Sequence, residues 1–373
     1  MLEDLEAALD PADASNDHRR WVAQQLLDSG IPDDDVLAIA TAPDILREMS
    51  FRVLFPGARM NASEFGARVG LTPDQLLDVR RAAGLWVDDV GHHDRVFATV
   101  DEEAFVAFAG GVALFGEQAT LQFVRVMGSA LAQVAEAAVA LFGARVAHPL
   151  SEQQATPEVQ FKSEVLATQA LAGVGSGLQT LFRFHAETAI RRLNRAREAA
   201  ESYNTARLAV GFVDLVGFTP LAERIDAAAL SDMFDEFEAI AYDVIAQHDA
   251  RLVKLIGDAV MFTALEADAA CDIALTLVEQ FEGDHSPVTP RGALAFGEML
   301  VRAGDYYGPV VNVAARAADQ AVPYEILVTD ELAAGTSDAF DVTPAGRRQL
   351  KGIASPVSLS TLTRATQGSG NGS

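Results

Sequence analysis

The sequence predicts an α/β (α+β) protein, in which a mostly α-helical N-terminal half precedes a ferredoxin-like βαββαβ domain. Three observations predict this architecture. The hydrophobic pattern has helical periodicity up to about residue 200 and then changes to strands alternating with helices. The elements expected after that point follow the order β-α-β-β-α-β. Hydrophobic residues make up 50% of the 373 positions, so the chain can bury the cores of two or three domains.

The first half contains helices whose ends are marked in the sequence. "HRRWVAQQLLDSG" stops at a glycine, and "PDQLLDVRRAAG" starts with proline and also stops at a glycine. Helical patterns also fit 101–146 and 158–200, with the turn-rich "AHPLSEQQATPE" between them. We therefore expect a helical domain over 1–185 and a linker helix over 186–202, in which arginine and glutamate are interleaved. This linker fits a simple spacer and a transmission element equally well.

The second half can be assigned element by element between residues 203 and 365. A strand ("RLAVGFVDLVGF") and a long amphipathic helix ("LSDMFDEFEAIAYDVIAQHD") come first, and "ARLVKLIGDAVMFTAL" then predicts two strands joined by a tight Gly-Asp turn. A helix (268–282), a strand (289–297), a helix opening at "PVVNVAARAADQA" and strands at "EILVTDEL" and "RRQLKGIASPVSLSTL" follow. We expect the helices on one face of the sheet. Residues 366–373 form a flexible tail.

The composition excludes several classes of protein. A formal net charge of −25 disfavours nucleic acid and anionic membrane as partners, although an individual basic pocket is compatible with it. The single cysteine, Cys271, lies in a helical pattern and is expected to be a buried small residue. The acidic N-terminus lacks the layout of a signal peptide. The longest charge-free stretch, Val165 to Phe182, fits a buried or dimer-interface helix better than a membrane span, so we expect a cytoplasmic protein.

Two aspartates in the second half are candidate metal ligands. Asp214 ends the strand "FVDLVGFT" and precedes a glycine-containing loop, whose backbone N–H groups suit a polyphosphate. Asp258 follows 44 positions later, at the tip of the predicted hairpin. The first strand and that hairpin are neighbours in a ferredoxin-like fold. Two converging carboxylates are typical ligands of the hard divalent ions used in phosphoryl chemistry.

Three further residues carry polar chemistry into apolar surroundings. Lys254 lies in the strand entering the hairpin, where lysine is unusual; a lysine paired with a carboxylate at the sheet edge is the structural alternative. Asn312 and Arg316, in "DYYGPVVNVAAR", are four residues apart and therefore share one helix face. Arginine offers a forked donor for phosphate oxygens, and asparagine a neutral hydrogen bond.

The segment from about residue 203 to 363 resembles the catalytic domain of class III nucleotide cyclases. The resemblance rests on "FVDLVGFT", "VKLIGDAVMF", "RGALAFGEML", "DYYGPVVNVAAR" and "LKGIASPV", in that order. It implies that Asp214 and Asp258 hold two Mg²⁺ or Mn²⁺ ions, and that Lys254 and Asp305 read the adenine of ATP. It further implies that Asn312 and Arg316 position the ribose and stabilise charge on the transferring phosphate, and that Lys351 contacts the triphosphate. The other substrate-binding residues that it implies come from the first motif: Phe212, Gly217, Phe218 and Thr219.

The resemblance also implies the reaction and the assembly. Such an adenylate cyclase converts ATP into 3′,5′-cyclic AMP and pyrophosphate by in-line attack of the ribose 3′-hydroxyl on the α-phosphorus. Its sites are shared in a homodimer, with the metal aspartates from one copy and the base-reading and transition-state residues from the other. No side chain in the motifs stands out as the general base. A catalytically silent nucleotide-binding domain is the alternative, although no metal or transition-state residue is missing here.

The first half resembles the autoregulatory domain of pH-responsive bacterial cyclases of this class. This implies autoregulation, with a fatty acid or other small apolar ligand as a candidate for the N-terminal domain. The candidate titrating groups are His92, His93, His148 and His185, because histidine changes charge near neutral pH. Residues 63–86 also resemble a helix-turn-helix followed by a β-wing. A packing module fits this acidic chain better than a DNA-binding regulator does.

Overall fold

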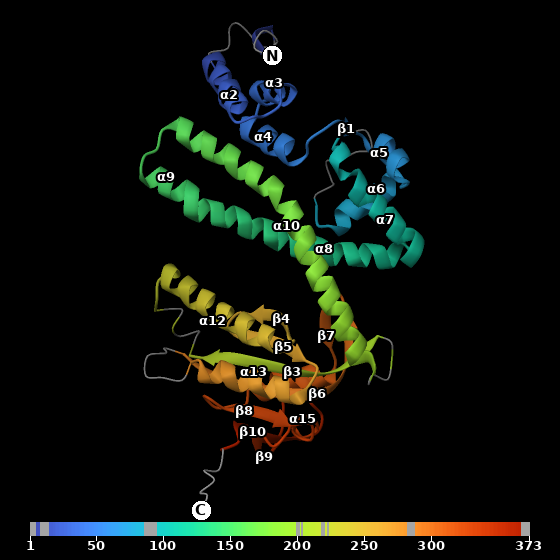
Figure 1. Cartoon of the computed structure of the whole chain (residues 1–373), viewed down its shortest axis with the longest axis vertical. Coiled ribbons are helices and arrows are strands. Elements are labelled where there is room, and N and C mark those ends of the chain that lie inside the picture. The colour runs from blue at the N-terminus through green and yellow to red at the C-terminus, as the bar shows by residue number, and fades with distance from the viewer. Residues whose placement is uncertain are drawn as a thin grey trace, which may run out of the picture. The chain divides into compact units, whose positions relative to one another are not determined.

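The computed structural model describes residues 5–7, 15–85, 95–198, 202, 204–217, 221, 224–281 and 288–366. The chain divides into two compact units, Met1–Phe184 and His185–Ser373. The first unit is almost entirely helical, and the second is built on a sheet (Figure 1).

The first unit opens with two small helical layers. Helices α2 (Asn16–Asp28), α3 (Asp33–Thr41) and α4 (Ile45–Leu54) bury one apolar core together with the start of α10. Helices α5 (Ala62–Val69) and α6 (Pro73–Ala82) follow, and each begins with a capping box that satisfies the free backbone N–H groups of its first turn. They occupy the expected helix-turn-helix segment. Strand β1 (Arg59–Met60) pairs antiparallel with β2 (Phe97–Ala98). The wing expected after the helix-turn-helix, over 86–100, lies mostly outside the described residues.

Long helices complete the first unit. They are η1 (Thr99–Asp101, 3₁₀), α7 (Glu102–Phe115), α8 (Glu117–Phe142), the π-helical η2 (Gly143–Ala147), α9 (His148–Glu152) and α10 (Pro157–Glu198). One expectation was wrong here. The stretch after residue 146 stays helical to Glu152, because its proline lies in the first turn of α9, where the missing N–H group is tolerated. The helical pattern over 158–200 is confirmed, since α10 runs for 42 residues without a break and includes the described part of the expected linker.

The second unit contains the predicted βαββαβ order. Its elements are β3 (Thr205–Val216), α12 (Ala227–Gln247), β4 (Arg251–Ile256), β5 (Ala259–Ala264), α13 (Ala267–Glu279) and β6 (Thr289–Arg302). Then follow β7 (Asp305–Tyr307), α14 (Pro309–Ala318), β8 (Ile326–Thr329), α15 (Asp330–Ala333), β9 (Phe340–Arg348) and β10 (Val357–Arg364). The sheet order is β4-β5-β3-β6-β8-β10-β9, with β7 paired to β6; only β6 and β8 run parallel among these pairs.

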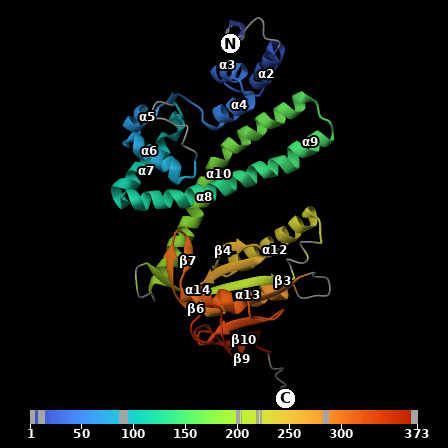
Figure 2. The ribbon, with the colours of Figure 1, turned by 180° about the vertical axis from the view of Figure 1, so that it is seen from behind.

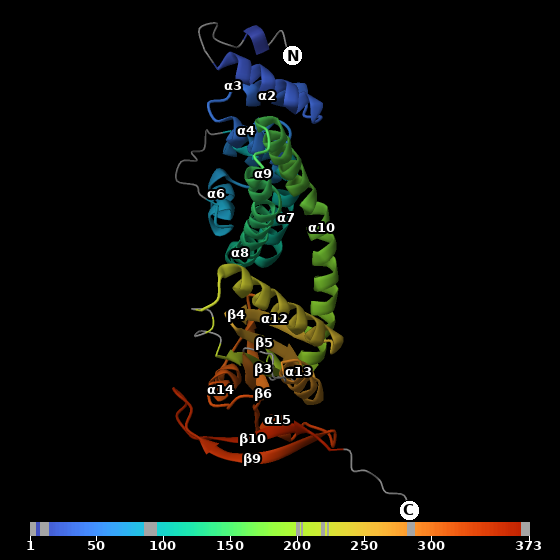
Figure 3. The same ribbon diagram turned by 90° about the vertical axis from the view of Figure 1, so that its left-hand side faces the viewer.

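Helices cover both faces of this sheet, so the expectation of a single covered face was wrong. Helices α12 and α13 pack on one face in a cluster that includes Phe237, Phe262 and Cys271. Helix α14 packs on the opposite face against Phe212 and Met261, and Ala196 at the end of α10 belongs to the same cluster. Figure 2 shows α14 beside β6, and Figure 3 shows α12 and α13 on the other side of the sheet. The helix periodicity reveals a buried stripe but not which sheet face it meets.

Two buried positions show how closely the side chains of this core are packed. Gly211 in β3 has no room for a side chain, because a Cβ there would lie 2.3 Å from the Phe262 ring. Cys271 is fully buried, as expected, and burial raises the pKa of its thiol to about 12. The sheet layer therefore fixes β3 closely against its neighbours.

One helical stretch, Glu117–Glu152, is long and apolar enough to cross a membrane by length and composition alone. None of its most apolar window is buried inside the chain. The charge-free stretch singled out in the sequence was a different one, in α10. Both stretches present apolar side chains at the surface, including Val139, Leu141, Leu166, Leu181 and Phe182.

Candidate active site

The two candidate metal ligands lie side by side at one end of the sheet. Asp214 is near the end of β3, where it pairs with Ala259 of β5. Asp258 precedes Ala259 in the β4–β5 turn, and its carbonyl accepts a hydrogen bond from the Leu215 N–H at 3.2 Å. The turn is made possible by Gly257, whose φ is 62°. The topology thus brings together two carboxylates that are 44 residues apart.

The electrostatics of this pair favour a cation between the carboxylates. Burial raises the pKa of Asp258, the negative charge of Asp214 raises it further, and Arg291 lowers it. Two adjacent, partly buried carboxylates repel each other, and a bound divalent ion relieves that repulsion. Carboxylate oxygens are also the ligands that Mg²⁺ and Mn²⁺ prefer. The residues present therefore fit the metals that the resemblance implies.

Arg291 is a site residue that the sequence reasoning missed. It lies at the start of β6, directly opposite Asp214 in the ladder, and its Nη2 is 3.3 Å from Asp214 Oδ2. Its Nη1 donates to the carbonyls of Asp319 and Ala321 at 3.2 and 3.0 Å. The Nε is buried without a hydrogen-bond partner in the described part of the chain. The sequence did contain a signal for Arg291: a charged residue in an otherwise apolar strand, the same observation that singled out Lys254.

Lys254 and Asp305 meet within one chain. Lys254 lies on the edge strand β4 and donates from Nζ to Asp305 Oδ2 at 2.5 Å. The other oxygen of Asp305 accepts the backbone N–H of Tyr306 at 2.8 Å. Two interpretations of Lys254 were open: a structural ion pair at a sheet edge, or a functional pair with Asp305. Both correspond to this one contact. Both side chains remain partly exposed, so a ligand can reach them.

The remaining predicted residues have different surroundings. Asn312 and Arg316 lie on the exposed face of α14, and Arg316 Nη1 is 3.2 Å from Asp319 Oδ2. Lys351 is exposed in the turn before β10. The Phe212 side chain is in the core on the α14 face of the sheet. Gly217 follows β3 and has a φ of 88°, and Phe218 and Thr219 lie outside the described residues.

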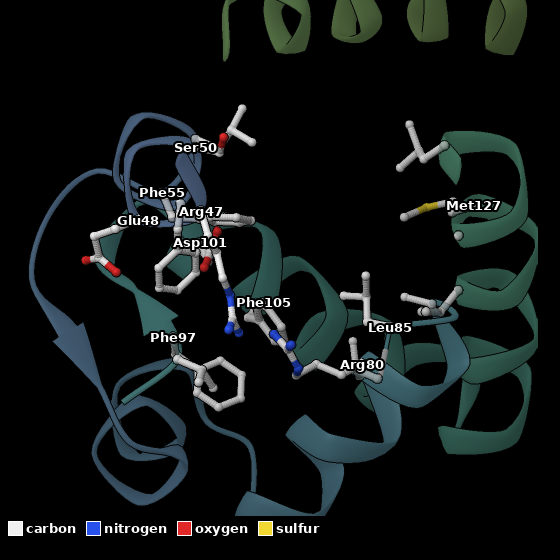
Figure 4. Close-up of a pocket in the computed structure, with 18 of the residues that line it drawn as sticks. Arg47, Glu48, Ser50, Phe55, Arg80, Leu85, Phe97, Asp101, Phe105 and Met127 are labelled. Atoms are coloured by element: carbon white, nitrogen blue, oxygen red, sulfur yellow. The ribbon is translucent and has the colours of Figure 1, made fainter. Parts of the chain in front are cut away.

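The first unit contains a cavity of about 980 Å³, formed by α4, α6, α7 and α8. Its wall is mostly apolar and includes Phe51, Phe97, Phe105, Met127 and Leu131. Figure 4 shows the side chains of Arg47 and Arg80 extending into this space, beside Phe105. A cavity of this size and polarity suits a small apolar molecule that carries a polar group.

Arg80 is a partly buried arginine in the wall of the cavity. Burial lowers the pKa of its guanidinium, and its Nε is buried without a hydrogen-bond partner among the described residues. Across the same cavity, burial raises the pKa of Asp101. Arg80 belongs to the second helix of the helix-turn-helix-like segment, and the neighbouring Arg81 is paired with Asp78. These arginines are engaged within the unit, which disfavours a DNA-reading role for this helix.

The candidate histidines do not gather into a site in the described part of the chain. His148 lies 3.7 Å from Glu152 on an exposed surface, and His185 is exposed on α10. His92 and His93 lie outside the described residues. A histidine not singled out from the sequence, His248, has a defined partner: its Nε2 is 2.6 Å from Asp272 Oδ2.

Comparison with known proteins gives relatives but no match to a protein-family model. The chain is 31% identical to an adenylate cyclase of Streptomyces griseus over 284 residues, 72% of this chain and 69% of that protein. It is 29% identical to a pH-sensitive adenylate cyclase of Mycobacterium tuberculosis over 364 residues, 95% of this chain and 90% of that one. The crystal structure of an adenylyl cyclase from P. aeruginosa superimposes on 44% of this chain with a TM-score of 0.40 and 23% identity.

Proposed function

The chain belongs to the class III adenylate cyclases, and from this premise we propose that it forms 3′,5′-cyclic AMP and pyrophosphate from ATP at metal-assisted sites shared between two copies. The observation that carries this proposal is the convergence of Asp214, Asp258 and Arg291 at one end of the sheet. Two carboxylates beside a guanidinium form a site for a metal-bound polyphosphate.

Asp214 and Asp258 are the residues that would hold two Mg²⁺ or Mn²⁺ ions. When bound, these ions supply positive charge that acidifies the ribose 3′-hydroxyl and neutralises phosphate oxygens. Arg291 would donate to phosphate oxygens beside the carboxylates, and its bonds to the carbonyls of Asp319 and Ala321, just after α14, orient it for that contact. The new bond joins O3′ to the α-phosphorus, and the bond to the pyrophosphate oxygen breaks.

The base-reading and transition-state groups act on other parts of the nucleotide. Lys254 donates to N1 of adenine and Asp305 accepts from the 6-amino group, which gives the preference for ATP over GTP. Arg316 offsets charge that develops on the α-phosphate, and Asn312 orients the ribose. Lys351 is exposed in the turn between β9 and β10, and it would contact the triphosphate.

The homodimer is supported by the apolar surface of the first unit. The helices α7, α8 and α10 expose large apolar side chains, with Leu114 74% and Phe184 68% exposed. Exposed apolar patches of this kind are typical of protein interfaces. We assign this surface to a second copy of the chain, and not to a membrane. Size-exclusion chromatography with light scattering in detergent-free buffer tests this, and a monodisperse monomer contradicts it. A cytoplasmic location stays a prediction.

Autoregulation by the first unit is proposed to use a fatty acid bound in the cavity. The apolar wall fits an acyl chain, and a carboxylate would satisfy the buried donor of Arg80. A charge-assisted hydrogen bond of this kind is worth about 1.5–3 kcal/mol. The Arg80→Met variant should therefore bind palmitate about ten- to a hundredfold more weakly by calorimetry. Hexadecanol, which has no carboxylate, should bind both proteins equally; an equal loss for both ligands would show that the cavity itself had collapsed.

The cyclase activity itself is tested with the purified full chain, ATP and Mg²⁺ or Mn²⁺. Asp214→Ala and Asp258→Ala each delete a metal ligand, so cyclic AMP formation should fall by about a hundredfold or more. Asp232→Ala removes an equal charge from the exposed face of α12 and should retain full activity. Circular dichroism checks that all three variants are folded. Activity of either metal variant within about tenfold of the wild type, with the same metal requirement, contradicts the assignment.

A further inference from the structure

The two residues proposed to read the adenine ring lie on strands that do not pair with each other. Among the described strands, β4 with Lys254 pairs only with β5, and β7 with Asp305 pairs only with β6. Strands β5 and β3 separate β4 from β6 in the sheet order. No backbone ladder therefore joins the strand of Lys254 directly to the strand of Asp305, and other contacts can influence their spacing.

The end of α10 contacts the start of β4. Arg192 is buried, with 8% of its surface exposed, and its Nη2 donates to the backbone carbonyl of Ala250 at 3.1 Å. Ala250 directly precedes β4. Asp249, one residue earlier, has a φ of 50° and pairs with Arg191 and Arg195 at 3.3 and 3.7 Å. Three arginines of one helix thus hold the turn from which β4 begins.

The same face of α10 also packs near β7. Ala196 is four residues after Arg192 and so lies on the same side of the helix. It is buried in the cluster that contains Tyr306, the residue following Asp305. Tyr306 is 2% exposed, and its N–H donates to the Asp305 carboxylate. One face of α10 therefore reaches both strands that carry the base-reading pair.

A further arginine, in β4 itself, links this strand to β7 and to the residue before it. Arg251, at the start of β4, donates from Nη2 to the carbonyl of Gly304, directly before β7, at 2.5 Å. Its guanidinium also lies 5.6 Å from the centroid of the Tyr306 ring. Arg192, Ala250, Arg251 and Tyr306 thus connect α10 to both strands through side-chain contacts, in addition to the backbone hydrogen bonds of the sheet.

We propose that Arg192 is a positioning residue for nucleobase recognition, which sets the spacing of Lys254 and Asp305 by holding Ala250. The inference rests on the proposed function, because it takes Lys254 and Asp305 to be the groups that contact adenine. Arg192 lies on a helix that is continuous with the N-terminal unit. A rotation of α10 would therefore shift β4 relative to β7 and alter the choice and affinity of the nucleotide.

The chemistry of Arg192 favours this role over simple packing. Burial lowers the pKa of its guanidinium, and its Nε is buried without a hydrogen-bond partner among the described residues. A buried charge with unsatisfied donors is costly, and an apolar residue of similar size would often be at least as stabilising. What an apolar residue cannot supply is a directed bond to the Ala250 carbonyl. That bond acts on position, so its loss should appear in recognition.

The test compares kinetics with ATP and GTP in the full chain. Arg192→Met keeps the aliphatic stem and removes the donor; we expect the KM for ATP to rise about tenfold and the ATP-to-GTP ratio of kcat/KM to fall by a similar factor. Arg192→Lys keeps a donor near the carbonyl and should recover most of the preference. Arg183→Met removes an equal charge from an exposed position of the same helix, away from the turn before β4, and should change neither quantity.

Several outcomes decide the inference independently of turnover. Calorimetry with non-cyclisable ATP and GTP analogues gives the binding ratio for each protein. If Arg192→Met lowers kcat for both nucleotides and leaves the KM and both ratios unchanged, the residue is structural and the inference is wrong, although the cyclase assignment stands.

If the wild type prefers the ATP analogue but forms no cyclic AMP, the proposed function fails and the binding ratio of Arg192→Met still decides the inference. A wild type without adenine preference overturns it. If Arg192→Met unfolds, Arg251→Met must show the loss of preference.

Discussion

Complementation between two inactive variants tests whether the active sites are shared between copies. The variants are Asp214→Ala, which removes a metal ligand, and Arg316→Ala, which removes a transition-state donor. Neither should unfold the chain. Asp214 keeps its backbone pairing with Ala259 and Arg291, and Arg316 is 48% exposed in an ion pair with Asp319. An exposed pair of this kind contributes about 0–1 kcal/mol.

The expected magnitude follows from where each residue acts. Each homodimer has both sites damaged and should be inactive. In a mixed dimer, one site collects both lesions, and the other takes its aspartates from the Arg316 variant and its α14 residues from the Asp214 variant. Random exchange makes about half of the dimers mixed, each with one intact site of two, so about a quarter of the wild-type activity should return.

The assay measures cyclic AMP after subunit exchange between differently tagged proteins, with the mixed species confirmed by tandem affinity capture. A mixture of Asp214→Ala with Asp258→Ala is the matched control. Both lesions then lie in the same half-site, so every site of every dimer is damaged and no activity should return. Recovery in the control, or none in the test mixture despite confirmed exchange, would falsify the division of residues between the two copies.

Two further predictions concern recognition and pH. Lys254→Glu with Asp305→Cys removes both base-edge hydrogen bonds, so kcat/KM for ATP should fall by about ten- to a hundredfold per contact; unchanged ATP kinetics would mean that Lys254 is only structural. Asp101 has a pKa raised by burial, so its neutral form is favoured in the folded state, and wild-type stability should fall as pH rises from about 3.9 through the raised value. Asp101→Asn should therefore have a higher Tm than wild type at pH 7, with an advantage that shrinks toward pH 4; a constant difference across that range would contradict this.

The local elements of the catalytic unit were predictable from the sequence because each has its own pattern. The Gly257-Asp258 turn, the amphipathic helices and the apolar strands all lie within a few residues of where they were expected. The topology then brings Asp214 and Asp258 together, as strand neighbourhood in a ferredoxin-like order requires. Local pattern and common strand order were sufficient for this part of the site.

The features that the sequence missed depend on register and on distant contacts. Arg291 becomes a site residue only when β6 is aligned with β3, which places it opposite Asp214. Arg80 looks like a solvated arginine on a surface helix, yet four helices from separate segments enclose it in a cavity. The continuous helix α10, by contrast, was predictable from the helical pattern over 158–200, because no proline interrupts it before Glu198.

The charges of the site are balanced within the chain, and this has a consequence for nucleotide binding. In a chain with a net charge of −25, Arg291 is paired with Asp214 and Arg316 with Asp319. A nucleotide that recruits these arginines must exchange each internal ion pair for one with phosphate, and only the difference between the two contributes to affinity. For Arg291 the exchange also releases the Asp214 carboxylate, which a divalent ion then occupies. Metal and nucleotide should therefore bind cooperatively. A phosphate that binds Arg291 releases Asp214 for the metal, and a metal that binds Asp214 releases Arg291 for the phosphate.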